Sequence, residues 1–178
     1  MRMFEPRIQQ QFFDSADLLY QSAETCPRAL CDALQAVVGC ITSGGKLLAT
    51  GSLLAPHAAA LFVDGFERER PPLAAVAVPA SANAVRALGL PGDVLLLLDD
   101  ALAPAAAQAL VDAAHDKDMS IVALTRAAPG WAATLTETDV LIAVPHERPA
   151  RVRELHLLML HALADAIDLQ LMGEQESA

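Results

Sequence analysis

Aromatic side chains and positive charge are both scarce in this chain. Phe, Trp and Tyr make up 4% of its 178 residues, and 12 Lys and Arg stand against 22 Asp and Glu, for a net charge of −10. A protein that binds nucleic-acid backbones needs a basic surface, so this balance argues against direct nucleic-acid binding. Apolar residues reach 54%, which favours a helix-rich α/β protein with a substantial core.

Long apolar runs and paired cysteines are missing as well. Runs such as Val94–Leu98 are far shorter than the roughly 20 residues that cross a membrane, and the N-terminus has no signal-peptide core. Cys26, Cys31 and Cys40 are odd in number and lack metal-binding or redox spacing. We therefore expect a cytoplasmic protein with reduced thiols, away from membranes and without a metal or other cofactor.

Two amphipathic helices are predicted at the start of the chain, over residues 5–24 and 27–42. In the first, apolar residues recur at steps of three and four, beginning with Phe4, Ile8 and Phe12. The glycines after Ser43 end the second helix. We interpret residues 1–43 as a helical hairpin that is used in oligomerisation.

Short apolar runs and helical segments alternate through the middle of the chain. The runs lack strict apolar–polar alternation, so both faces of the sheet should be covered, as in a parallel sheet. Residues 46–145 are thus predicted to form an α/β core, a three-layer αβα sandwich with a five-stranded parallel sheet. The expected strands are residues 46–50, 73–78, 94–98, 120–124 and 140–144, and the expected helices are residues 55–66, 83–88, 103–117 and 130–135.

A last helix is predicted over residues 149–172, and it is apolar on two faces. The sheet should bury one face, and either the N-terminal helices or a second subunit should bury the other. Three such helices carry more apolar surface than a five-stranded sheet can absorb, which favours a homo-oligomer. We expect residues 1–178 to form one domain.

Two acids, Asp99 and Asp100, follow the third predicted strand, and Pro104 begins the next helix. Open parallel sheets bind ligands beyond the carboxyl ends of their strands, where a helix N-terminus can hold an anion. Carboxylates at this position complement the helix dipole themselves and repel a phosphate. Paired catalytic carboxylates are the alternative, although adjacent residues at a strand end point in opposite directions.

The order of these segments resembles a sugar isomerase (SIS) domain, in the branch of the phosphoheptose isomerases and the replication-initiator-associating proteins. The resemblance covers nearly the whole chain and implies a tetramer assembled through the terminal helices. Its marks are Gly45–Leu48, Phe66–Pro71, Gly92–Leu96, Asp118–Thr125, Asp139–Pro145 and Arg151–His156. Two of these marks, Phe66–Pro71 and Asp118–Thr125, are more similar to the initiator-associating group.

Both phosphate-binding loops of the family are altered here. The Gly-rich first loop corresponds to Gly51–Pro56 and the Ser- and Thr-rich second loop to Asp99–Pro104. A phosphate needs several converging donors, and the replacements remove donors and add like charge. We therefore expect a cleft that has lost its phosphate site. Its expected ligand-cleft residues are Ser52, His57, Asp99, Asp100 and His161.

The family also carries a metal and acid–base set of His, Glu, Gln and His. The resemblance aligns His57 and His161 with the two histidines, but Leu61 replaces the Glu and Arg153 replaces the Gln. The Glu is the base that aldose–ketose isomerisation requires, and two ligands rarely hold a metal. We therefore interpret both histidines as vestigial, expect no metal and no catalytic residue, and lean against an enzyme.

Three functions remain open from the sequence. The leading hypothesis, implied by the resemblance, is a non-catalytic scaffold that binds the bacterial replication initiator and regulates the initiation of DNA replication. Leu171 and Met172, at the end of the last helix, would contact that partner, with core packing as the alternative for both. The other hypotheses are a phosphoheptose isomerase acting on sedoheptulose 7-phosphate and a domain that senses a sugar derivative.

Overall fold

The predicted elements all form in the computed structural model, which describes residues 4–127 and 129–173. The α-helices are α1 (Glu5–Thr25), α2 (Pro27–Thr42), α3 (Ala55–Asp64), α4 (Ala82–Leu88), α5 (Pro104–His115) and α6 (Pro149–Met172). The strands are β1 (Leu47–Thr50), β2 (Ala75–Ala77), β3 (Val94–Asp99), β4 (Ser120–Arg126) and β5 (Val140–Val144). Gly130–Thr134, expected to be helical, is the 3₁₀ helix η1.

The five strands form one parallel sheet, as predicted, and the structure shows their order to be β2-β1-β3-β4-β5. Leu47 of β1 lies between Ala75 of β2 and Val94 of β3. The chain runs outward from β1 to β2 and then crosses back to β3. This reversal makes the β1–β3 boundary the switch point of the sheet, where open α/β folds bind ligands.

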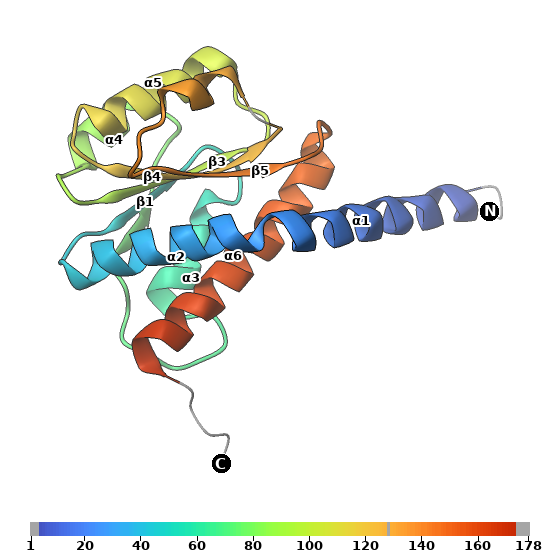
Figure 1. Cartoon of the computed structure of the whole chain (residues 1–178), viewed down its shortest axis with the longest axis horizontal. Coiled ribbons are helices and arrows are strands. Elements are labelled where there is room, and N and C mark those ends of the chain that lie inside the picture. The colour runs from blue at the N-terminus through green and yellow to red at the C-terminus, as the bar shows by residue number, and fades with distance from the viewer. Residues whose placement is uncertain (1–3, 128, 174–178) are drawn as a thin grey trace.

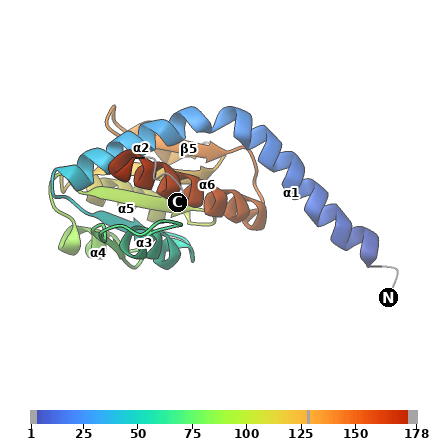
Figure 2. The same ribbon diagram turned by 90° about the horizontal axis from the view of Figure 1, so that it is seen from below.

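Helices cover both faces of the sheet, which confirms the three-layer arrangement (Figures 1 and 2). Alternate side chains of β3 face opposite ways: Leu96 packs into the core with α2, α3 and α6, whereas Leu95 and Leu97 pack into the core with α4, α5 and η1. Since the strands are buried on both sides, they need no polar positions along their length, and this explains the continuous apolar runs.

Helices α1 and α2 do not form the expected hairpin. Figure 1 shows α1 leading out of α2 and projecting beyond the sheet. Cys26, between the two helices, keeps helical backbone angles (φ −90°, ψ −22°), and Pro27 occupies the first turn of α2, where its missing N–H is tolerated. The chain therefore bends without reversing. Only Leu18 and Ser22 of α1 are buried, so its apolar stripe has no cover within the described chain.

Helix α6 lies across the same face of the sheet as α2 and α3. By length and composition alone it could cross a membrane. Its buried apolar residues, among them Val152, Leu155 and Ile167, belong to the main core cluster. The apolar composition of α6 is therefore explained by its position as a core helix that is covered on two sides.

His156 is a buried polar exception on the apolar face of α6. Its side chain is fully buried near Thr125 at the end of β4, and neither ring nitrogen has a hydrogen-bond partner among the described residues. Burial lowers the pKa of His156 to about 4. The ring is therefore neutral at pH 7.

The backbones of β1 and β3 approach each other closely at the switch point. Gly51, directly after β1, has φ +106°, and a Cβ atom there would lie 2.4 Å from the carbonyl oxygen of Leu98. No side chain fits in that space, and the angle itself disfavours other residues.

Gly51→Ala should lower the free energy of unfolding by about 3 kcal/mol, because it adds a backbone clash to an unfavourable φ. Gly44→Ala is the matched control, since Gly44 has φ +84° but no neighbouring atom within 4 Å, and it should cost about 1 kcal/mol. Urea denaturation of both variants measures the difference. Equal losses would contradict the close approach.

Acid should destabilise the fold through His156. Between pH 6.5 and 4 the unfolded chain binds a proton at this ring that the folded chain does not, so the free energy of unfolding falls as the pH falls. The loss is at most about 3 kcal/mol. His156→Leu should flatten the pH dependence in denaturation curves, while the control His146→Gln, in the loop before α6, should keep the pH dependence of the wild type. A His156→Leu protein that is as acid-sensitive as the wild type would refute this assignment.

Candidate functional site

The carboxyl edge of the sheet brings together two histidines that are 104 positions apart. His57 lies in the first turn of α3 and is exposed, and His161 on α6 is half-buried. Their Nε2 atoms are 3.0 Å apart, with one ring edge facing the other. One Nε2 must carry a proton and donate a hydrogen bond, and the other must accept that bond. Either ring can be the donor.

Phe66 fixes one side of this histidine pair. Its ring stacks on His161 at a centroid distance of 4.9 Å. Its backbone N–H lies 3.5 Å from Asp168, the buried acid of α6. The stack limits the rotation of the His161 ring and leaves its Nε2 directed toward His57.

A buried ion pair holds the two helices that carry the histidines. The side chains of Arg70 and Asp168 are each 1% exposed and contact each other. Arg70 also donates to the carbonyl oxygens of Leu61 and Phe62 at the end of α3, where backbone acceptors lack helical partners. One guanidinium group thereby ties α3 to α6, and it was not identified from the sequence.

The two strand-end acids point to opposite sides of the sheet, as the alternation predicts. Asp99 accepts a bond from the N–H of Leu102 (2.9 Å) and faces the indole N–H of Trp131 (3.4 Å). Burial raises the pKa of Asp99. Asp100 contacts Arg153 of α6 at 2.5 Å instead. Asp99 therefore caps the turn before α5, while Asp100 is an ion-pair partner and caps nothing.

The five residues expected to line one cleft are thus divided among several places. Asp99 lines a pocket with Arg126 and Trp131 on the α5 side. The hydroxyl of Ser52 accepts the N–H of Leu54 in the turn after β1, in agreement with the turn role expected for it. Only His57 and His161 contact each other directly.

The residues around the histidine pair do not fit a metal ion. Leu61, one turn after His57, belongs to the apolar core, and Arg153 brings a positive charge. No cluster of three or more His, Cys, Asp or Glu occurs among the residues described. Stable sites usually need three or four ligands, so we derive no step that uses a metal.

The two residues proposed at the end of α6 lie in different environments. Leu171 packs against the main core cluster, whereas 42% of Met172 is exposed. Packing thus accounts for Leu171, and a partner contact through Met172 stays a prediction.

Two known proteins to which this chain is similar share one name. No family model matches the chain. A phosphoheptose isomerase of Methylibium petroleiphilum is 51% identical, with the similarity covering 99% of both chains. A phosphoheptose isomerase of Azoarcus sp. is 37% identical over 96% of this chain and 98% of its own length.

Solved structures agree with these relatives. A phosphoheptose isomerase from Neisseria gonorrhoeae superimposes with a TM-score of 0.82 at 31% identity, covering 93% of this chain and 98% of that one. A phosphoheptose isomerase from Francisella tularensis also gives a TM-score of 0.82, at 28% identity and over 92% and 97% of the two chains.

These findings correct the leading functional hypothesis. The expectation of a non-catalytic regulator of replication initiation, and the leaning against an enzyme, are wrong, because relatives that match nearly the whole chain are named as isomerases. The altered loops and Leu61 argue against an enzyme, but they are local changes in a chain whose similarity to isomerases extends over nearly its whole length. With the sugar isomerase fold and a relative at 51% identity, the chain belongs to the phosphoheptose isomerase family.

Proposed function

We propose that this protein is a sugar-phosphate isomerase of the phosphoheptose type, acting on sedoheptulose 7-phosphate. The names of its relatives support this reaction class. The observation that carries the proposal is the contact between His57 and His161, since two imidazoles 3.0 Å apart at the carboxyl edge of the sheet can exchange protons with a bound sugar.

The reaction moves one proton between two neighbouring carbons and another between their oxygens. The unprotonated Nε2 of the pair takes a proton from the carbon beside the carbonyl group, while the Nε2–H of the other ring donates to the carbonyl oxygen. The first ring then delivers a proton to the former carbonyl carbon, while the second ring takes the proton of the hydroxyl group on the neighbouring carbon, which becomes the new carbonyl group. No oxidant or reductant is required, and the two imidazoles end in their starting protonation states.

Leu61 removes one alternative base from this scheme. It stands where the family resemblance places a Glu, and its buried side chain cannot bind a proton. The imidazoles are therefore assigned both proton-transfer roles. Neutral histidine is an effective base near pH 7, and so the assignment is chemically sufficient without a carboxylate.

We also propose that the protein assembles as a homo-oligomer, a tetramer by resemblance. Phe4, directly before α1, is exposed by 59%, and Phe12 and Tyr20 of α1 are exposed by 71% and 77%. An apolar groove lies where α1 meets α2, lined by Leu19, Leu30 and other residues of α1, α2 and α6. Exposed apolar surface of this kind is typical of a subunit contact.

The cytoplasm remains the compartment that we propose. All three cysteines are free, and Cys26 and Cys40 are buried. Reduced, unpaired thiols are usual in proteins of a reducing compartment.

The isomerase should convert sedoheptulose 7-phosphate in an NMR assay, and both histidines should be needed. His57→Gln, and His161→Phe (which keeps an aromatic ring against Phe66), should each lower kcat/KM at least about 100-fold, because each removes a proton-carrying nitrogen. His146→Gln is the control and should retain activity. A wild-type protein without turnover, or variants as active as the control, would contradict the proposal.

Assembly should depend on the apolar stripe of α1. Light scattering should give the wild type a mass several times that of the 18.8 kDa chain. Phe12→Glu should shift the protein toward the monomer, since it places charge in the proposed contact, and the polar control Gln10→Glu on the same helix should not. A monomeric wild type at micromolar concentration would exclude the assembly.

A further inference from the structure

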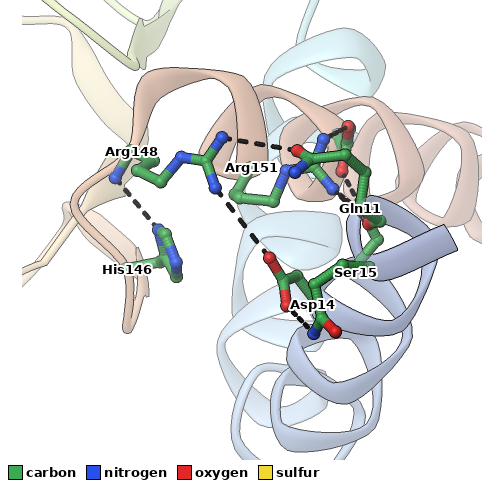
Figure 3. Close-up of polar contacts among 8 residues, drawn as sticks. Gln11, Asp14, Ser15, His146, Arg148 and Arg151 are labelled. Carbon is green, nitrogen blue, oxygen red and sulfur yellow. Dashed lines mark hydrogen bonds and ion pairs between the residues drawn. The ribbon is translucent and has the colours of Figure 1, made fainter. Parts of the chain in front are cut away.

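The arginines near the start of α6 differ in what they bind. Figure 3 shows Arg148 and Arg151 turned toward α1, where Arg148 contacts Gln11 and Asp14, and Arg151 contacts the Gln11 carbonyl and Ser15. Both arginines therefore hold α1 on the body of the protein. Arg153 points elsewhere: it reaches across to Asp100, at the end of β3.

Arg153 has unused hydrogen-bonding capacity. Its Nε–H donates to the carboxylate of Asp100 at 2.5 Å, but neither terminal amino group has a partner among the residues described. One third of the Arg153 side chain is exposed, against 6% for Asp100. The free edge of a guanidinium group matches two oxygens of an oxyanion, which makes it a natural contact for a phosphate.

A second polar group near the same ion pair is also unsatisfied. His156, one turn after Arg153, is fully buried with both ring nitrogens unpaired among the described residues, and it lies within the electrostatic reach of both Asp100 and Arg153. A buried donor without a partner costs free energy. A ligand oxygen or a water brought in with it would relieve that cost.

The spacing along α6 suits a long, phosphorylated sugar. Arg153 and His161 are eight residues apart, about 12 Å along the helix and about 80° around it. This separation is comparable with an extended heptose from its carbonyl end to its terminal phosphate. A carbonyl at the histidine pair would therefore place the phosphate near Arg153.

We propose that Arg153 binds the phosphate group of the substrate and that Asp100 is an internal competitor, which holds the guanidinium until the phosphate arrives. The inference deepens the proposed isomerase function and rests on it for the identity of the substrate. It also assigns a role to Asp100 at the switch point. The carboxylate keeps Arg153 in place and weakens the binding of anions through like charge.

The test is isothermal titration calorimetry, in which inorganic phosphate is added to the protein at constant ionic strength. Asp100→Asn should bind phosphate about tenfold more tightly than the wild type, because a competing charge is removed while a side chain of similar size remains. Arg153→Gln in the Asp100→Asn background should abolish that binding. The double variant leaves no buried unpaired charge, so it should fold, and thermal denaturation checks this.

Arg148→Gln in the Asp100→Asn background is the matched control and should bind phosphate as tightly as Asp100→Asn alone. If Asp100→Asn gains no affinity, or if the Arg153→Gln double variant keeps it, the proposal is overturned. The readout involves no turnover. A protein that binds phosphate through Arg153 but does not isomerise the sugar would therefore refute the catalytic proposal and leave this one standing.

Discussion

The contact between α6 and the sheet fixes the position of the histidine pair and of the Arg153–Asp100 ion pair. Val152, Leu155 and Ile167 bury one side of the helix in the main core. The same helix then presents Arg153 to the end of β3 and His161 to α3. Because these side chains share one rigid element, their spacing follows from helix geometry. Loss of packing along α6 would separate the histidine pair and the ion pair together.

The arrangement of the elements was largely predictable from the sequence, since it follows from local patterns. Unbroken apolar runs such as Val94–Leu98 indicate strands covered on both faces, and the structure has that sheet. The predicted hairpin of α1 and α2 was wrong. Pro27 stands at the start of the second helix, and a proline in the first turn of a helix is compatible with a simple bend as well as with a reversal of the chain. Local sequence does not distinguish these two outcomes.

The site was less predictable, because its contacts join residues far apart in the chain. The family resemblance located His57 and His161. No local sequence pattern predicts that Arg70 pairs with Asp168, 98 positions away, or that Arg153 pairs with Asp100, 53 positions away. The strand-end acids were correctly expected to face opposite ways, since that depends only on strand alternation. Their partners depend on how α6 and η1 are placed.

The central claim is that the histidine pair moves a proton to and from a sugar phosphate. The most direct measurement is NMR of sedoheptulose 7-phosphate incubated with the protein in D₂O, because exchange at C1 reports proton abstraction even where little product accumulates. The account predicts that the signal of one of the two C1 hydrogens is lost with the wild type, and that both signals persist with His57→Gln. Two undiminished C1 signals with the folded wild-type protein would contradict it.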